Sequence, residues 1–361
     1  MVNVSNMSSI LITSVPGVED IVIEELKELA RLVKVEQISP GKLLVFLNES
    51  DLERFLLKVS HLRSIERVIL VIFDDVLDKP TLDNIALAIR TKIKEKGELF
   101  KYATPLMSYS VQVKRTGRHK FTSVDVARVV GETINLVIKE TFGKESSIRL
   151  ECPDIKFDVE VIDNRLIFGI DVTGPRPLHE REYKVYLHPS SLNPIIAYAM
   201  IKLAKIKPGH RVLDPMCGSA TILIECGLYY ENVELYGVDI NPKFLEGAKI
   251  NIRKAGLENR IKLLFGDATS LEEFFSQNYF DRVLSNLPYG IRSGSPYSIQ
   301  DLYSKFLSSV KKVLKDDGLL VLLTARRRAL ERAIRLNNFK KVSVRVIEQG
   351  GLYSAIYLLR P

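Results

Sequence analysis

Cysteine is scarce in this sequence and is not arranged for cross-linking. Three cysteines, Cys152, Cys217 and Cys226, occur among 361 residues, and no pair has the CxxC spacing. An odd, scattered set argues against a disulfide framework or a cysteine zinc site, and for reduced thiols in the cytoplasm. Histidine offers no substitute, because His179 and His188 have no further candidate ligands beside them in the sequence. No metal site is therefore predicted.

Long apolar runs are also missing. The amino terminus reads MVNVSNMSSILITSVPG, in which no basic region precedes the short apolar run. No other stretch approaches the roughly 20 apolar residues that a membrane helix needs. Neither secretion nor insertion into a membrane is predicted.

Two common nucleotide-binding motifs are absent as well. The sequence contains no GxxxxGK followed by Ser or Thr, so no phosphate cradle is predicted. It also lacks a complete GxGxxG, which disfavours a dehydrogenase. We find no internal repeat and no low-complexity segment.

The size and charge of the chain set broad limits. A chain of 361 residues suits two or three domains, and its 46% hydrophobic content is enough for full cores. The net charge of +8 favours a polyanionic partner. An ordinary basic protein without such a partner fits the charge equally well.

Four short apolar segments follow one another between residues 211 and 286. Each is rich in Val, Leu or Ile and ends in a polar or acidic residue: RVLD, ELYGVD, IKLLFGD and FDRVLSN. Such segments, separated by helical patterns, are typical of a parallel sheet with helical crossovers. Ligands bind beyond the carboxyl ends of the strands in these sheets, so we expect the functional site there.

The first three strand ends predict a pocket for a nucleoside with a charged tail. After Asp214, small residues up to Thr221 let the backbone approach a ligand, and the free N–H groups of the following helix attract a carboxylate. Asp239 is placed for the two hydroxyls of a ribose. Asp267, followed by Ala268, is placed for the exocyclic amine of an adenine. One such aspartate alone is more often a helix cap, but three at successive strand ends, with Gly218 and Asn286, favour the pocket.

The fourth strand end, Asn286-Leu287-Pro288-Tyr289, suits methyl transfer to a planar amine. The Asn286 side-chain oxygen and the Leu287 carbonyl, held by Pro288, are expected to accept two hydrogens of an –NH2 group. That arrangement points the nitrogen lone pair toward an electrophile. Tyr289 offers a face on which an extruded base stacks. No general base is assigned, because a methylated arylammonium loses its proton to water or to Asn286.

These motifs resemble those of a known family. The pair DPMCGSAT and NLPYG is similar to motifs of the S-adenosylmethionine-dependent amino-methyltransferases. A longer run, LNPIIAYAM, DPMCGSATILIE and NLPYGIR, resembles the THUMP-containing tRNA (guanine-N2)-methyltransferases, and the likeness extends to residues 111–131. Within that family the archaeal type, which acts on guanosine 6 of the tRNA acceptor stem, is the most similar.

The resemblance implies a Rossmann-like methyltransferase domain, S-adenosyl-L-methionine as cofactor, and tRNA as partner through its 3′ end and acceptor stem. The implied catalytic residues are Asn286, Leu287, Pro288 and Tyr289. The implied cofactor-binding residues are Asn193, Asp214, Met216, Gly218, Ser219, Ala220, Thr221, Asp239, Ile240, Asp267, Ala268 and Asn286. The chain departs from the family at Ala220, where glycine is usual and an added methyl group would narrow the cofactor loop. Enzymes acting on guanosine 10 usually carry aspartate where this chain has Asn286.

The amino-terminal half is predicted to hold two modules. Strand and helix patterns over residues 10–13, 18–33, 42–47, 51–59 and 67–73 suggest an α+β, ferredoxin-like unit in residues 1–75. Residues 76–173 resemble THUMP, a module associated with the 3′ end of tRNA. Basic residues that are predicted to bind RNA are Lys114, Arg115, Arg118 and Lys120, before a helix at Ser123, and Arg292 after NLPYG. A solvated charged loop is the alternative for the basic segment.

The rest of the chain is predicted to be a linker and a second α/β domain. Residues 174–189 lack periodicity and contain Gly174-Pro175, so we place the linker there. Residues 190–361 are predicted to form a doubly wound sheet with a terminal antiparallel hairpin, and Ser190 is a candidate helix cap. Arg326-Arg327-Arg328 opens a helix, where cations oppose the dipole, so an RNA contact and a solvated face are both plausible. A monomer is expected.

Other interpretations stay open at this point. NPPY-type motifs also serve methyltransferases that act on ribosomal RNA, on DNA adenine or on protein glutamine, although the basic amino-terminal module favours tRNA. A tRNA-binding protein without activity is a further alternative because of Ala220. The sequence decides neither which guanosine is modified nor whether one or two methyl groups are added.

Overall fold

The chain forms two compact units. The computed structural model describes residues 7–97, 99, 103–188, 191–290 and 298–361. The first unit comprises Met1–Thr13, Leu26–Leu62 and Arg67–Leu178, and the second comprises Ser14–Glu25, Arg63–Glu66 and His179–Pro361. Two short amino-terminal segments therefore group with the carboxyl-terminal half of the chain.

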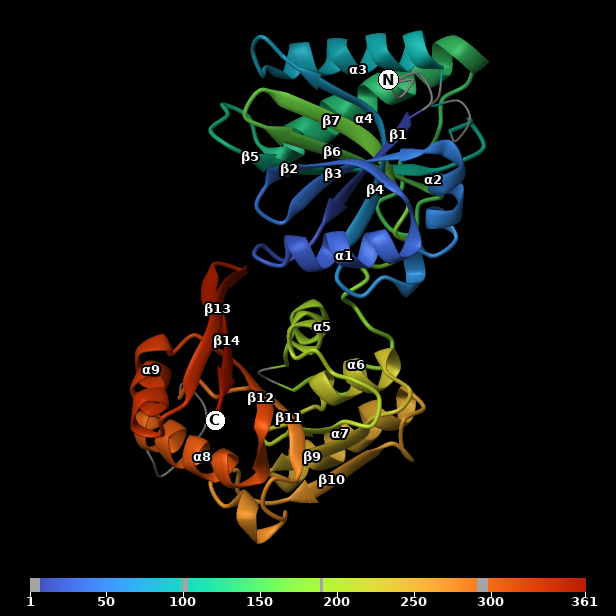
Figure 1. The fold of residues 1–361 in the computed structure, drawn as a ribbon. Helices are drawn as coiled ribbons and strands as arrows, with labels where there is room; N and C mark the ends of the chain where they lie inside the picture. Colours follow the sequence, from blue (N-terminus) through green and yellow to red (C-terminus); the bar gives the residue numbers. More distant parts are fainter. Residues whose placement is uncertain (1–6, 98, 100–102, 189–190, 291–297) are drawn as a thin grey trace. The chain divides into compact units, whose positions relative to one another are not determined.

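Residues 7–171 build one mixed sheet with helices packed on it (Figure 1). Its elements are β1 (Met7–Thr13), α1 (Glu19–Leu29), β2 (Leu32–Ser39), β3 (Lys42–Asn48), α2 (Glu49–Leu56), β4 (Arg67–Val76), α3 (Leu82–Lys96), β5 (Tyr109–Thr116), α4 (Ser123–Phe142), β6 (Ile155–Ile162) and β7 (Arg165–Asp171). The strand order is β2-β3-β1-β4-β7-β6-β5, so the antiparallel pair β4 and β7 joins the two predicted modules in a single sheet.

Helices α3 and α4 cover part of this sheet through apolar residues at helical spacing. Ile85, Ile89 and Ile93 of α3 are fully buried, and they share one core with residues of α4 and of strands β4 to β7. Phe157 and Phe168 stack at the centre of this core with their rings 5.5 Å apart. Strands β6 and β7 follow each other closely in the chain and pair antiparallel as a hairpin.

One amino-terminal element differs from the prediction. Helix α1 ends at Leu29 instead of continuing to Val33, and β2 follows it directly. Leu32 and Val33 continue the apolar spacing of the helix, which explains the error. Leu32 pairs instead with Leu47 of β3, Val33 lies at an irregularity of the pairing, and the resulting edge strand is only partly buried.

The second unit is a doubly wound α/β domain. Its elements are α5 (Pro194–Leu203), β8 (Arg211–Asp214), α6 (Thr221–Tyr229), β9 (Glu234–Asp239), α7 (Pro242–Lys254), β10 (Ile261–Phe265), β11 (Phe280–Asn286), α8 (Ile299–Val313), β12 (Leu314–Thr324), α9 (Arg327–Leu336), β13 (Lys340–Gln349) and β14 (Leu352–Arg360). The strand order is β10-β9-β8-β11-β12-β14-β13.

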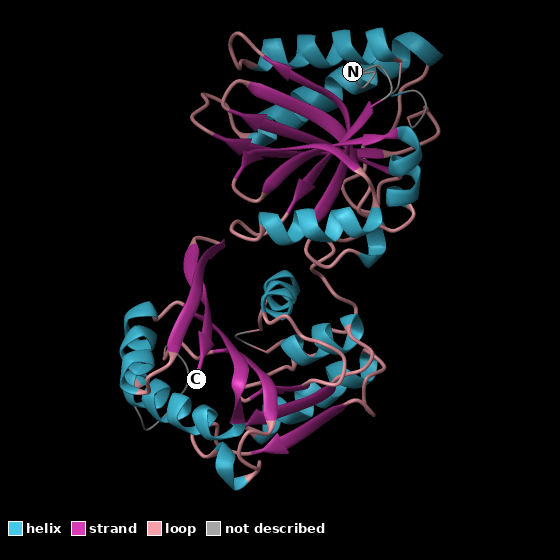
Figure 2. Ribbon diagram, in the orientation of Figure 1, coloured by secondary structure: helices cyan, strands magenta, loops and turns pink. Residues whose placement is uncertain are grey.

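Strands β8 to β12 are parallel, whereas β14 is antiparallel to both β12 and β13. This arrangement confirms the predicted α/β class and the terminal hairpin. Helices lie on both sides of the sheet, with α8 and α9 on one side and α5, α6 and α7 on the other (Figure 2). The core under α8 and α9 contains fully buried Phe280, Tyr303 and Phe306. The parallel strands place all their carboxyl ends at one edge.

Candidate active site

The carboxyl ends of β8, β9 and β11 lie side by side. β8 pairs with β9 through Asp214 and Gly237 and with β11 through Leu213 and Val283. Asp214 is therefore flanked by the end of β9, which carries Asp239, and by the end of β11, which carries Asn286. This is the convergence expected from a parallel sheet.

Hydrogen bonds link these strand ends across the loop after β8. The Gly218 N–H donates to Asp239 Oδ2 at 2.8 Å, which joins the loop to β9. The Ser285 hydroxyl donates to Asp214 Oδ1 at 3.2 Å, which joins β8 to the residue before Asn286. Asp214 also accepts the Met216 N–H at 3.3 Å. The loop after β8 is thus held by two aspartates, Asp214 at the end of β8 and Asp239 at the end of β9.

Asp214 is buried without a cationic partner among the described residues. Its exposed fraction is 2%. Burial raises the pKa of Asp214 to about 7, and the charge of Asp239 adds to that shift. The hydrogen bonds from Met216 and Ser285 act in the opposite direction. A carboxylate in this setting favours a ligand that brings positive charge.

Ala220 adopts a conformation that usually requires glycine. It is the N-cap of α6, its φ is +62°, and its side chain provides no capping bond. A left-handed residue with a Cβ costs roughly 1–2 kcal/mol. The whole residue is 0% exposed, so its methyl group lies inside the protein and not on the open surface of the loop. The alanine therefore strains the backbone more than it narrows the loop.

The start of α6 offers free N–H groups. The first N–H groups of any helix have no partner within the helix, and here no side chain caps them. The Ser219 hydroxyl lies 3.3 Å from the Thr221 hydroxyl and 3.4 Å from that of Ser191, so hydroxyls surround this turn. A carboxylate fits this environment.

Asp239 and Asp267 both support the loops that follow them. Asp239 Oδ1 accepts the Asn241 N–H at 2.9 Å, and Asp267 Oδ1 accepts the Thr269 N–H at 2.8 Å. The capping interpretation of these aspartates therefore holds in part. Each carboxylate oxygen has a second lone pair, so these bonds do not prevent contact with a ligand.

Two exposed apolar side chains lie beside Asp239. Ile240 is 64% exposed, and Phe265, which pairs with Asp239 in the sheet, is 62% exposed. Ala268, in the loop that follows β10, is buried. An apolar surface next to an acidic group suits a heterocycle attached to a ribose. Phe265 was missed from the sequence because its exposure depends on where β10 ends.

His188 is a second residue that the sequence did not single out. Its ring lies 3.9 Å from the position that a Cβ on Gly218 would occupy, and it meets the Phe244 ring edge-on at 4.1 Å between centroids. Burial lowers the pKa of His188, while the charge of Asp239 raises it. The segment before His188 is attached to α7 through Tyr186, whose N–H donates to Asn251 Oδ1 at 2.7 Å. His188 thus borders the loop after β8.

Polar contacts hold the segment Asn286 to Tyr289 in place. The Tyr289 hydroxyl donates to Asn286 Oδ1 at 3.3 Å, within the motif itself. The Tyr303 hydroxyl donates to the Pro288 carbonyl at 2.8 Å and lies 2.9 Å from the Thr324 hydroxyl.

The backbone of Tyr289 is fixed from α9, because the Arg326 Nε donates to the Tyr289 carbonyl at 2.8 Å. Asn286, Pro288 and Tyr289 are partly exposed, whereas Leu287 is buried. Burial raises the pKa of Tyr289, so its phenol stays protonated at neutral pH. The partly exposed Asn286 is thus presented on a segment that neighbouring side chains hold in place.

Asn193 has a local structural role. Its Oδ1 accepts the Ile195 N–H at 2.8 Å and so caps α5. Ser190 and Arg292, the other predicted contacts in this part of the chain, lie outside the described residues.

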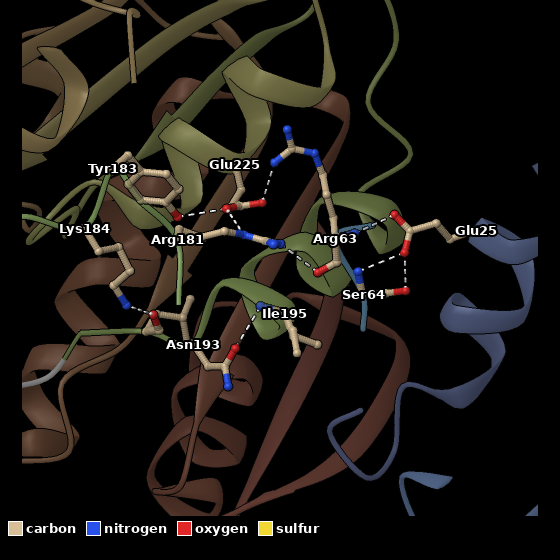
Figure 3. A network of polar contacts seen from close by, with 10 residues as sticks. Glu25, Arg63, Ser64, Arg181, Tyr183, Lys184, Asn193, Ile195 and Glu225 are labelled. Atoms are coloured by element: carbon tan, nitrogen blue, oxygen red, sulfur yellow. Dashed lines mark hydrogen bonds and ion pairs between the residues drawn. The ribbon is translucent and has the colours of Figure 1, made fainter. Parts of the chain in front are cut away.

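Glu225, a buried carboxylate of α6, is the centre of a network of polar contacts (Figure 3). Glu225 is 0% exposed and accepts bonds from the Tyr183 hydroxyl at 2.8 Å, Arg63 at 2.9 Å and Arg181 at 3.0 Å. Arg181 also donates to the Arg63 carbonyl at 2.9 Å. This network holds in place the helix that follows the loop after β8.

In the first unit the basic residues are arranged differently from the prediction. β5 continues through Thr116, because its parallel pairing with β6 extends that far, so Lys114 and Arg115 lie in a strand. Arg115 donates to the Ser123 hydroxyl at 3.3 Å and lies over the Phe121 ring. Arg118 and Lys120 are exposed in the loop before α4, as predicted.

The described residues hold neither of two other kinds of site. They contain no group of three or more His, Cys, Asp or Glu side chains arranged to hold a metal ion. None of the helices in the described ranges combines the length and apolar character that crossing a membrane requires.

Comparisons with known proteins agree with this geometry. A model described as "THUMP domain" matches residues 82–171, and one described as "RMKL-like, methyltransferase domain" matches residues 181–355. A tRNA (guanine(6)-N2)-methyltransferase of Methanocaldococcus jannaschii is 33% identical over 96% of this chain and 98% of its own length.

Solved structures give the same result. The crystal structure of TrmN from Thermus thermophilus matches with a TM-score of 0.79 and 29% identity, over 98% of this chain and 99% of that one. SMU.472, a methyltransferase solved with SAH, matches with a TM-score of 0.80 over 98% of both chains, and at 18% identity it supports the fold alone. With the motif residues gathered at one sheet edge and relatives matching almost end to end, this chain belongs to the THUMP-containing tRNA (guanine-N2)-methyltransferase family.

Proposed function

We propose that this protein methylates the N2 amine of a guanosine in tRNA, at position 6 of the acceptor stem, with S-adenosyl-L-methionine as donor. The observation that supports this most is the position of Asn286, which ends β11 next to the strand that carries Asp214 and the cofactor loop. The M. jannaschii relative, matched almost end to end, is named for guanosine 6.

S-adenosylmethionine supplies a sulfonium methyl group. The first turn of α6 and its hydroxyls would hold the amino-acid tail, while Asp214 would favour the positive charge of the ligand. Asp239 would accept the ribose hydroxyls, and Asp267 would accept the adenine amine between Ile240 and Ala268. His188 would cover the loop from the side of Gly218. All of these roles rest on side chains at one edge of one sheet.

The guanine would be held by the segment after β11. Asn286 Oδ1 and the Leu287 carbonyl would accept the two N2 hydrogens, and Tyr289 would stack on the base. Its bond to Asn286 Oδ1 already orients that amide oxygen. A new N–C bond would form as the S–C bond of the donor breaks, and the amine would then lose one proton to water. Because charge moves from sulfur to nitrogen, positioning supplies most of the acceleration.

The remaining expectations form part of the same proposal. Residues 1–75 would brace residues 76–173, whose Lys114, Arg115, Arg118 and Lys120 would contact the 3′ end of tRNA, and Arg292 would contact the substrate. Residues 174–189 would form the linker, and residues 190–361 would form the methyltransferase domain. The protein would act as a monomer in the cytoplasm.

Nucleoside mass spectrometry of a tRNA transcript treated with the protein and labelled S-adenosylmethionine tests this proposal. N2-methylguanosine that maps to position 6 is expected, and Asn286→Ala should lower kcat about 100-fold because the amine is no longer held. Calorimetry with S-adenosylmethionine provides the control, since the variant should bind the donor as the wild type does. No heat of binding for the wild type would favour a tRNA-binding protein without activity. A label on another nucleoside, or full turnover by the variant, would refute the assignment.

A further inference from the structure

Helix α9 presents an arginine-rich surface that the proposed chemistry does not use. The four exposed arginines Arg327, Arg328, Arg332 and Arg335, here named the α9 arginine face, project from its ten residues. With Glu331 and Tyr357 they line an open hollow of about 540 Å³. Arg326, just before the helix, adds a further positive charge.

The fold does not neutralise these charges. The carboxylate of Glu331 is paired with Lys341 at 3.1 Å. Among the described residues, no ion pair involves Arg327, Arg328, Arg332 or Arg335. By contrast, the partly exposed Arg90 of the first unit pairs with Glu140 at 2.6 Å. Like charges at Arg328 and Arg332, one turn apart, oppose helix formation by a few tenths of a kcal/mol.

The base of the hollow is polar. Tyr357 is 0% exposed, and its hydroxyl has no hydrogen bond of normal geometry among the described residues, although Arg327 and Glu331 lie nearby. A buried hydroxyl is usually bonded. Arg327 and Glu331, the charged side chains near this hydroxyl, also line the hollow.

The α9 arginine face begins next to the candidate active site. α9 follows β12, which pairs with β11 through Leu323 and Asn286, so both strands end at the same edge. Arg326 makes the direct connection through its bond to the Tyr289 carbonyl. From there a helix of ten residues extends about 15 Å. Duplex RNA that delivers a base to Asn286 would therefore come close to the start of this face.

We propose that the α9 arginine face binds the phosphate backbone of the RNA helix that carries the target base. This inference rests on the proposed function and adds the surface that holds the substrate. Guanidinium groups bind phosphate oxygens in pairs of hydrogen bonds, and such contacts position an RNA without reading its sequence. The face thus sets affinity and orientation, while Asn286 and Tyr289 act on the base.

The test uses a triple charge reversal, R328E/R332E/R335E, in the full-length protein with a tRNA transcript. Affinity is measured by fluorescence anisotropy over a range of salt concentrations. The variant should bind at least ten-fold more weakly at low salt, and the plot of log K against log salt should lose about 2.7 in slope, at about 0.9 for each of three phosphates. KM for tRNA should rise, whereas the affinity for S-adenosylmethionine should stay at the wild-type value.

Two further variants make the result specific. R253E/K254E reverses two exposed charges at the end of α7 in the same unit and should change affinity less than two-fold. R328K/R332K/R335K keeps the charge and should keep most of the salt slope, even if the reversal disturbs folding.

Unchanged affinity and slope in the folded reversal variant would overturn the inference. So would an equal loss in the α7 variant, which would indicate attraction to net charge alone. Absence of methylation by the wild type, with tRNA binding intact, would instead count against the proposed function.

Discussion

At the scale of single residues, Asp214 connects the fold to the proposed binding of a cationic ligand. It sits at the end of β8, is almost fully buried, and carries a raised pKa near 7 because of that burial. The pKa of Asp214 is higher in the folded protein than in the unfolded chain, so its protonation favours folding. This contribution to stability is fully present below about pH 4 and is lost as pH rises through about 7. Without a ligand, ionisation of Asp214 therefore lowers the stability of the folded protein.

Binding of a cation should remove part of that cost. We predict that affinity for S-adenosylmethionine rises roughly ten-fold between about pH 5.5 and 8 and levels off above the pKa of the free protein. Calorimetry over this range measures the effect, and Asp214→Asn should give a flat profile with weaker binding. A flat profile for the wild type would show that Asp214 does not ionise on binding.

Some site residues could be predicted from the sequence, and others could not. Asp214, Asp239 and Asn286 each end an apolar segment, and parallel pairing then places them at one edge. Phe265 and His188 carry no such signal. Their places depend on the end of β10 and on the packing of an aperiodic segment, which are both tertiary features.

At the scale of elements, α8 and β12 hold the segment after β11. Tyr303 of α8 is fully buried, and its hydroxyl donates to the Pro288 carbonyl while contacting Thr324 at the end of β12. This hydroxyl is one of the links between the segment Asn286 to Tyr289 and the core of the second unit. Tyr303 is therefore a positioning residue, since it does not itself reach the open surface.

Removing that hydroxyl should affect turnover more than binding. We predict that Tyr303→Phe lowers kcat about ten-fold, because the segment carrying Asn286 loosens, and costs about 1–3 kcal/mol of stability because the Pro288 carbonyl loses its donor. Single-turnover methylation and donor affinity are the measurements, and donor affinity should not change. The control Tyr279→Phe removes a hydroxyl that is hydrogen-bonded to the Tyr236 hydroxyl and does not contact the segment Asn286 to Tyr289. Equal kcat values for the two variants would argue against the positioning role.

Element boundaries could be predicted where caps and breaks are present. Thr81 and Gly97 mark the two ends of α3 in the sequence, and in the structure Thr81 accepts the Asn84 N–H while Gly97 is left-handed. β2 was missed because no glycine or proline separates it from α1. The apolar pattern of β12 is visible only from Leu319 onward, whereas the strand begins at Leu314, because polar Asp316 and Asp317 interrupt the apolar run without ending the strand.

At the scale of the whole molecule, the second unit draws together distant parts of the sequence. Glu225 on α6 binds Arg63, Arg181 and Tyr183, which come from three separate places in the chain. The side chains of Arg63 and Arg181 are only 20% and 12% exposed. Losing their shared carboxylate leaves two largely buried cations without this partner.

We predict that Glu225→Ala lowers the free energy of unfolding by about 3–5 kcal/mol. Urea denaturation followed by circular dichroism measures this. Glu225→Gln keeps the side-chain shape and an acceptor for Tyr183, so it should lose less. A loss below about 1 kcal/mol for the alanine variant would show that the network contributes little to folding.

The overall topology was predictable only in part. The alternation of strand and helix after residue 211 predicts a doubly wound domain, and its terminal hairpin is confirmed. The antiparallel pairing of β4 with β7, which makes one sheet of residues 7–171, depends on contacts between segments about 100 residues apart. The assignment of residues 14–25 and 63–66 to the second unit has the same long-range origin.

The most direct test of the central claim replaces the proposed acceptor itself. A tRNA transcript with inosine at position 6 differs from the guanosine form by the N2 amine alone. The account predicts rapid labelling of the guanosine transcript, no labelling of the inosine transcript, and similar affinity for both. Labelling of the inosine transcript at the guanosine rate would contradict the claim that Asn286 presents this amine to the methyl donor.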